Sequence, residues 1–113
     1  MAPIRVYEKP TCTTCRKLAE LLTERGVDFD QVDYHVFPLS EDEIRALLAK
    51  TGAGPREVLR TREPECELVS DDTSDDELIA LMAEHPALLQ RPIVEVGDRA
   101  VLARPPERAL ELL

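Results

Sequence analysis

The chain has 113 residues, of which 43% are hydrophobic and 33% are charged, as in an ordinary soluble globular protein. It carries 14 Lys and Arg against 23 Asp and Glu, so its formal net charge is −9. A surface this acidic repels phosphate backbones and anionic lipids, which argues against nucleic-acid binding and membrane docking. The sequence contains neither a transmembrane-length apolar run nor a signal-peptide pattern, and its three cysteines are too few for a secreted disulfide framework. We therefore expect a cytoplasmic protein.

The N-terminal part predicts a strand, a helix and a second strand. Apolar and polar residues alternate over 3–7, which is typical of a short strand. From Thr13 the spacing becomes helical, with three leucines on one face, and Gly26 stands where a helix-ending glycine belongs. Residues 27–33 alternate again, so the connection suits a parallel crossover between the two strands.

The middle of the chain is predicted to be helical. Ser40 and Glu43 form a capping box ahead of an apolar stripe, and a segment with glycine and proline ends that helix. A short helix is expected over 55–60. Ser74 and Glu77 repeat the capping box and predict a third helix, which stops before a proline.

The C-terminal part changes period once more. Residues 92–96 and 99–103 read as two antiparallel strands joined by a turn at Gly97 and Asp98, and 107–113 as a last short helix. There is no repeat and no linker-like segment. We therefore expect one α/β domain spanning 1–113.

The chemical centre is the pair Cys12 and Cys15, at the junction of the first strand and the first helix. A helix N-terminus carries free N–H groups and a partial positive charge, so it stabilises a thiolate, which is the nucleophilic form of cysteine. Cys15 lies about one helical turn from Cys12, so the pair can close into a disulfide. This spacing indicates thiol redox chemistry.

Two other interpretations compete with the redox pair. A zinc site needs two further ligands, and the candidates Cys66, His35 and His85 lack ligand spacing. Inert buried thiols are common in proteins. Cys66 fits the interpretation of an inert buried thiol, and Cys15 could also fit it if it faces inward. Cys12 lies directly ahead of a helix, where an inert buried thiol is not expected, so a chemical role is favoured for Cys12.

Three arginines stand beside turns or prolines: Arg60, Arg91 and Arg104. A guanidinium fork matches the oxygens of a tetrahedral oxyanion, and the expected fold would bring Arg91 and Arg104 near the Cys12 sulfur. The alternative is that each arginine is one half of a surface ion pair. Spacing alone favours that alternative for any single arginine.

The combined motifs resemble the ArsC/Spx family over essentially the whole chain. The matching segments are Tyr7-x-x-Pro10-x-Cys12-x-x-Cys15-Arg16-Lys17, Glu84-His85-Pro86 and Arg91-Pro92-Ile93-Val94. The resemblance implies a thioredoxin-like fold, an α/β architecture with a mixed four-stranded sheet and a helical insertion between the second and third strands. The family includes glutaredoxin-linked arsenate reductases, uncharacterised relatives and Spx-type transcriptional regulators.

The resemblance also implies roles for single residues. Cys12 matches the nucleophile that attacks arsenate, and Pro92 matches a proline that is usually cis and faces that cysteine. The residues expected to bind the oxyanion are Cys12 with the backbone N–H groups that follow it, at Thr13 and Thr14, and the side chains of Arg60, Arg91 and Arg104.

Two positions depart from the glutaredoxin-type reductases. Those enzymes carry His where this chain has Glu8, and that His helps to lower the nucleophile's pKa, whereas a nearby Glu8 would raise it unless Lys9 and the arginines compensate. The second cysteine, Cys15, is more typical of the Spx-type regulators. The cysteine motif thus looks partly like the regulators, and the arginines look like the reductases.

The function expected from these features is reduction of arsenate to arsenite, with Cys12 as nucleophile and Cys15 as the candidate resolving thiol. Electrons would come from glutathione with glutaredoxin, or from thioredoxin, and no bound metal or organic cofactor is expected. We expect a monomer. Two alternatives remain open: a redox-sensing regulator that binds RNA polymerase, and a general thiol-disulfide oxidoreductase.

Overall fold

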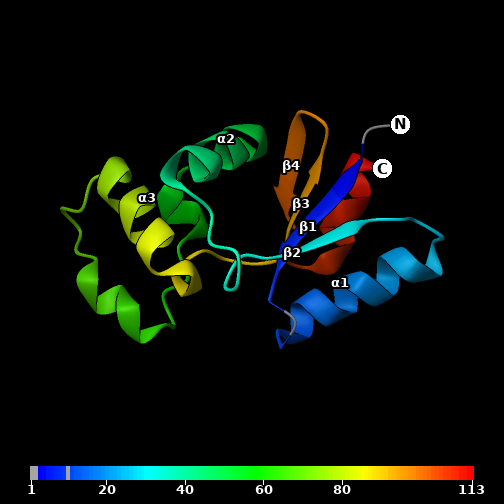
Figure 1. Ribbon diagram of the computed structural model, residues 1–113, viewed down its shortest axis with the longest axis horizontal. Coiled ribbons are helices and arrows are strands. Elements are labelled where there is room, and N and C mark those ends of the chain that lie inside the picture. Colours follow the sequence, from blue (N-terminus) through cyan, green and yellow to red (C-terminus); the bar gives the residue numbers. More distant parts are fainter. Residues whose placement is uncertain (1–2, 10) are drawn as a thin grey trace.

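Four strands form one sheet. Some helices pack against this sheet, and the others form a separate helical half of the molecule beside it (Figure 1). The computed structural model describes residues 3–9 and 11–113, so Pro10 of the cysteine motif lies outside the described residues. The strands and longer helices are β1 (Ile4–Glu8), α1 (Thr13–Glu24), β2 (Asp30–Asp33), α2 (Glu41–Thr51), α3 (Asp75–Glu84), β3 (Ile93–Val96) and β4 (Arg99–Leu102). The short 3-10 helices are η1 (Pro55–Val58), η2 (Pro64–Leu68), η3 (Pro86–Leu88) and η4 (Pro106–Leu112).

The sheet is mixed, with strand order β2-β1-β3-β4. β1 pairs in parallel with β2 and antiparallel with β3, and β3 and β4 form an antiparallel hairpin around Gly97, whose φ is +61°. The helices α2 and α3, with η1 to η3, are inserted between β2 and β3. The predicted thioredoxin-like architecture is confirmed.

Strand alternation sends the side chains of β1 to two different hydrophobic clusters. Ile4 and Val6 face α1 and η4, whereas Tyr7 faces the cluster that includes α2 and α3. The buried residues of the first face are Ile4, Val6, Leu18, Leu22, Val94, Val101, Ala103 and Ala109. Because both faces of the sheet are covered, its central strands β1 and β3 are largely apolar.

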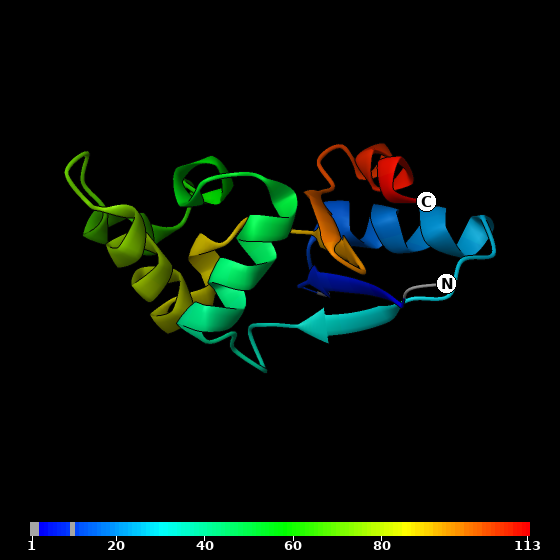
Figure 2. The same ribbon diagram turned by 90° about the horizontal axis from the view of Figure 1, so that it is seen from above.

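The helical half packs as a unit beside the sheet, on the side away from η4 (Figure 2). Its buried residues include Ile44 of α2, Leu78 of α3 and Leu88 of η3. The hydroxyl of Tyr34, which follows β2, donates a 2.6 Å hydrogen bond to the Leu89 carbonyl. This buried bond ties the chain leaving the sheet to the chain returning to it.

Both predicted capping boxes are present. Ser40 accepts a hydrogen bond from the Glu43 N–H at 3.1 Å, and Ser74 accepts one from the Glu77 N–H at 3.2 Å. In each case the glutamate side chain bonds back to the N–H of the serine. These local contacts explain why the starts of α2 and α3 were readable from the sequence.

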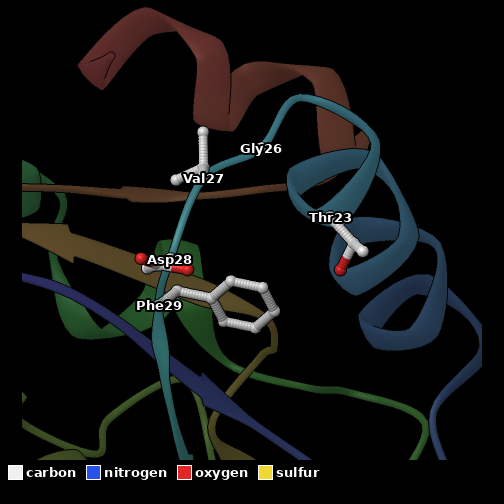
Figure 3. A pocket seen from close by; sticks show the side chains of 5 residues that line it. All are labelled: Thr23, Gly26, Val27, Asp28 and Phe29. Atoms are coloured by element: carbon white, nitrogen blue, oxygen red, sulfur yellow. The ribbon is translucent and has the colours of Figure 1, made fainter.

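The second strand is shorter than the predicted range 27–33, because only Asp30–Asp33 pair with β1. Arg5 is opposite Asp30, so continued pairing would bring Asp28 opposite Pro3, which has no N–H to donate. The preceding side chains serve packing instead: Val27 points toward η4 and Phe29 toward α1 (Figure 3).

Other boundaries differ by small amounts. The predicted short helix over 55–60 ends at Val58, and the predicted last short helix over 107–113 is the 3-10 helix η4. The helices η2 and η3 were not predicted, because stretches of three to five residues carry no periodic signal. Among the described residues, no helix has the length and apolar character needed to cross a membrane.

Replacing Leu22 by Ala should lower the free energy of unfolding by about 3 kcal/mol, because the side chain is fully buried between α1 and the sheet. Phe37→Ala is the control, since Phe37 is 71% exposed and its loss should cost less than about 0.5 kcal/mol. Urea unfolding measures both. Equal losses in the two variants would contradict the packing described for α1.

Candidate active site

Cys12 is the residue immediately before the first turn of α1. Its backbone is extended, its N–H donates to the Lys9 carbonyl at 2.9 Å, and its carbonyl accepts from the Arg16 N–H at 3.0 Å. The first strand and the first helix thus hold the cysteine between them. The backbone N–H of Cys15, in the first helical turn, interacts with the Cys12 sulfur.

A cavity of about 280 Å³ opens in front of Cys12. Its lining residues are Thr11, Cys12, Thr13, Thr14, Arg60, Arg62, Arg91 and Arg104. The three arginines and the two threonines predicted from the sequence therefore meet at one cavity. Their roles in binding stay predictions.

Two lining residues were missed, Thr11 and Arg62. Arg62 follows Arg60 by two residues, so its proximity along the chain was an available signal. With Arg62 included, four arginines line the cavity, and none of its lining residues in the described part of the chain carries a carboxylate. A cavity with this charge attracts anions even though the chain as a whole is strongly acidic.

Arg91 is the most deeply placed of these arginines, with 4% of its surface exposed. Its Nε and Nη1 atoms are buried, and no described residue accepts a hydrogen bond from them. The Arg91–Pro92 peptide bond is cis, as the family resemblance implied for Pro92. A buried guanidinium with two unused donors beside an open cavity fits an anionic ligand.

The backbone explains why Arg60 and Arg91 lie together. The segments on either side of them pair antiparallel at Leu59 and Leu89. The Arg60 N–H donates to the Leu88 carbonyl at 2.7 Å, and the Gln90 N–H donates to the Val58 carbonyl at 2.8 Å. This two-sided pairing anchors one wall of the cavity in the helical half of the molecule.

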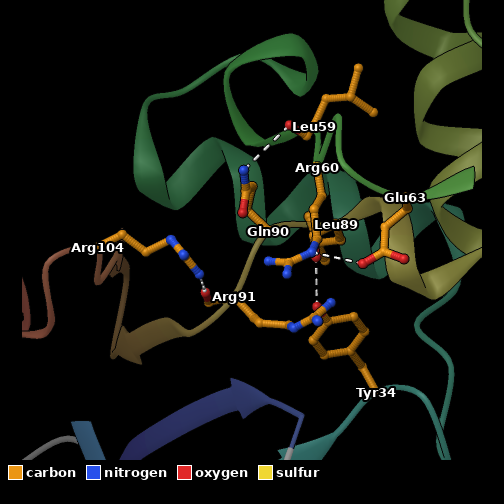
Figure 4. Close-up of polar contacts among 8 residues, drawn as sticks. All are labelled: Tyr34, Leu59, Arg60, Glu63, Leu89, Gln90, Arg91 and Arg104. Carbon is orange, nitrogen blue, oxygen red and sulfur yellow. Dashed lines mark hydrogen bonds and ion pairs between the residues drawn. The ribbon is translucent and has the colours of Figure 1, made fainter. Parts of the chain in front are cut away.

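The side chains of Arg60 and Arg104 are held by separate contacts (Figure 4). The Nε atom of Arg60 donates to the Glu63 carboxylate at 2.8 Å. Arg60 therefore does form an ion pair, as the alternative interpretation expected, but only through its Nε atom. The Nη1 atom of Arg104 donates to the Arg91 carbonyl at 2.8 Å. Neither contact occupies a whole guanidinium, so each arginine keeps N–H groups for a ligand.

The pKa of Cys12 lies below that of an ordinary thiol. Burial by itself would raise this pKa, but the backbone N–H and thiol of Cys15 and the positive charge of Arg91 outweigh it. The lowered pKa increases the thiolate fraction at neutral pH, and the thiolate is the nucleophile.

Cys15 has the opposite environment. It is fully buried on the inner face of α1, and it is not among the residues that line the cavity. Burial raises its pKa to about 12; the Lys9 N–H acts in the opposite direction, and Cys12 and Glu8 raise the pKa further. All three cysteines are free, and Cys66 packs partly buried against the helical core.

Glu8 is a buried carboxyl at the end of β1, with 5% of its surface exposed. Burial raises its pKa, and the nearby charge of Asp33 adds to the shift. From the sequence, Glu8 is expected to oppose ionisation of Cys12 if it lies nearby. In the structure its charge acts on Cys15 instead.

The two histidines are not placed to bind a ligand in the cavity. His35 packs against Tyr34, with ring centroids 4.7 Å apart, and both ring nitrogens are buried. Burial lowers its pKa, and the charges of Arg91 and Lys9 lower it further. His85 ends α3, where its N–H donates to the Leu81 carbonyl at 2.7 Å.

Comparison with known families decides the relationship. The model of the ArsC family matches residues 7–112. The chain belongs to the ArsC family. The match includes the cysteine motif and every arginine of the cavity.

Similar proteins carry two kinds of name. An arsenate reductase of Escherichia coli is 37% identical, in an alignment that covers all of this chain and 82% of the reductase. An uncharacterized protein from the glnII region of Streptomyces viridochromogenes is 35% identical and matches 97% of this chain and 98% of its own length. The solved structure of an arsenate reductase from Vibrio cholerae superposes with a TM-score of 0.92 at 34% identity, covering 99% of this chain and 98% of that one.

Arg91→Gln should move the midpoint of Cys12 ionisation to higher pH by about one unit, because the substitution removes the cation that stabilises the thiolate. The rate of alkylation by iodoacetamide against pH measures this midpoint, in a Cys66→Ser background that leaves Cys12 as the accessible thiol. Arg45→Gln, on the exposed side of α2, is the matched control. Identical midpoints in all three proteins would contradict the role given to Arg91.

Proposed function

We propose that this protein is an arsenate reductase, with Cys12 as its nucleophile. The observation that carries the proposal is the cavity in which a cysteine of lowered pKa meets four arginines. Relatives named arsenate reductase at 37% identity over the whole chain support the choice of oxyanion. Arsenate would lie between Arg60, Arg91 and Arg104, with the N–H groups of Thr13 and Thr14 as further donors.

The first chemical step is attack of the Cys12 thiolate on arsenic. A sulfur–arsenic bond forms, and one arsenate oxygen leaves as water after protonation. The arginines hold the oxyanion in position and neutralise its charge, which lets a negative sulfur approach a negative substrate. This step changes no oxidation state.

The second step transfers two electrons to arsenic and can follow one of two routes. Glutathione attacks the Cys12 sulfur and glutaredoxin clears the mixed disulfide, or Cys15 attacks it and thioredoxin reduces the resulting disulfide. Cys15 lies close enough to influence the Cys12 sulfur, which favours the second route. We place the reaction in the cytoplasm, where such thiol donors are kept reduced, and assign the activity to a monomer without bound metal or organic cofactor.

The assay for this proposal is arsenate-dependent oxidation of NADPH by the purified protein. One arm supplies glutathione, glutaredoxin and glutathione reductase, and the other supplies thioredoxin and thioredoxin reductase. Cys12→Ser should abolish turnover in both arms, because the nucleophile is lost. Cys15→Ser should abolish turnover only in the thioredoxin arm.

The outcomes of this assay separate the open alternatives. Full activity of Cys15→Ser with thioredoxin as sole donor would exclude Cys15 as the resolving thiol. Absence of turnover in both arms would exclude the reductase, and binding of the oxidised chain to RNA polymerase would then test the regulator.

Removing one anion-binding side chain should weaken substrate binding. Arg104→Gln deletes a charge-assisted hydrogen bond, so we expect KM for arsenate to rise about tenfold or more. Arg45→Gln again serves as the control, because Arg45 pairs with Asp76 on the surface of the helical half. An unchanged KM in Arg104→Gln would remove Arg104 from the proposed site.

A further inference from the structure

Cys15 has a chemical difficulty if it is to act as the resolving thiol. Its thiol is fully buried, and a pKa of about 12 leaves about one molecule in 10⁵ as thiolate at pH 7. Only the thiolate attacks a sulfur efficiently. A proton acceptor next to Cys15 is therefore required, and solvent cannot reach the buried sulfur to serve as one.

The alternation of β1 places a carboxyl at this position. Ile4 and Val6 face α1, so the next residue in that row, Glu8, faces it as well. Cys15 begins the buried row of α1 that continues with Leu18 and Leu22. The two rows pack against each other, and Glu8 and Cys15 occupy the same end of them.

The backbone confirms this proximity. The N–H of Lys9, the residue directly after Glu8, interacts with the Cys15 sulfur, and the charge of Glu8 acts on the same thiol. No group in residues 3–9 and 11–113 forms an ion pair or hydrogen bond with the Glu8 carboxyl. The residue as a whole is 5% exposed, and a carboxyl that is largely shielded from water without such a partner is costly, which favours a chemical use for it.

We propose that Glu8 is the proton acceptor that activates Cys15. The inference rests on that part of the proposed function in which Cys15 attacks Cys12. When Cys15 attacks the arsenic adduct, its proton passes to the Glu8 carboxylate and a Cys12–Cys15 disulfide bond forms. The sulfur–arsenic bond breaks and its electron pair stays on arsenic, so arsenic is reduced from V to III while the two cysteines are oxidised. Glu8 returns the proton to Cys15 when the external thiol donor reduces the disulfide.

The surroundings of Glu8 suit this role. Asp33 of β2 is its partner in the parallel register, and the like charge of Asp33 and burial both hold its pKa above that of an ordinary glutamate. Cys15 of α1 is the other titratable group linked directly to it, and Cys15 interacts in turn with Cys12, which precedes α1 and lies beside Arg91, two residues before β3. A carboxylate whose pKa is raised is a stronger base than an ordinary one.

An assay without arsenate isolates this step. In a Cys66→Ser background, the aromatic disulfide dithiobis(nitrobenzoate) reacts with Cys12 and releases one coloured nitrothiobenzoate. Attack of Cys15 on the resulting mixed disulfide forms the Cys12–Cys15 bond and releases the second. The rate constant of the second release, divided by that of the first, reports activation of Cys15.

Glu8→Gln should lower this ratio at least about tenfold at pH 7, because it keeps the shape of the side chain and removes the base. The second release should then increase about tenfold per pH unit, as expected for hydroxide acting as the base. In the parent protein it should instead level off above the pKa of Glu8. Glu24→Gln removes an equal charge from the exposed side of α1 and is the matched control.

Two results would overturn the inference: a ratio in Glu8→Gln within twofold of the parent across the pH range, or a single release in the parent. If Glu8→Gln does not fold, Asp33→Asn replaces it. Loss of the Asp33 charge should move the midpoint of the second release to lower pH, and an unmoved midpoint would overturn the inference. Because the assay contains no arsenate, its result is independent of whether arsenate is the substrate.

Discussion

The buried guanidinium of Arg91 is the constraint on which the rest of the site depends. Arg91 lies two residues before β3 and is almost wholly shielded from water. Its Nε and Nη1 groups donate no hydrogen bond to any described residue. Burying a cation without an anion is unfavourable, so the surroundings of Arg91 are stable only when negative charge is near. The Cys12 thiolate supplies part of that charge, and a bound oxyanion would supply the rest.

The two cysteines differ because Cys12, ahead of the first turn of α1, lines the cavity, whereas Cys15, one turn further on, is fully buried. Cys12 meets the cavity, free N–H groups and a cation, so its thiolate is favoured. Cys15 meets the interior and a carboxylate, so its thiol stays protonated. The same spacing that permits a disulfide therefore separates a thiol of lowered pKa from a thiol of raised pKa, and the proposed mechanism uses the first as nucleophile and the second as resolving thiol. This division is what a two-step thiol reaction requires, because the resolving thiol must not react before the substrate has been attacked.

Much of the fold was predictable because its signals are local. The starts of α2 and α3 follow from capping boxes, and the β3–β4 hairpin follows from alternation around Gly97. The predicted second strand, 27–33, is longer than the observed one. The alternation of apolar and polar residues continues to Val27, but the partner strand offers no hydrogen-bond donor at Pro3. The short helices η2 and η3 were missed, since they depend on packing in the helical half rather than on a repeating pattern.

By itself, the sequence determined the order of the elements, the place of Cys12 ahead of a helix, and the resemblance to the ArsC family. It also identified Arg60, Arg91 and Arg104 as candidates, but spacing alone favoured surface ion pairs for each. Only the tertiary structure decided that the three share a cavity, that Arg62 joins them, and that Glu8 faces Cys15. The physical reason is that charge, burial and pKa depend on neighbours distant along the chain, and those neighbours are set by the pairing of strands and the packing of helices.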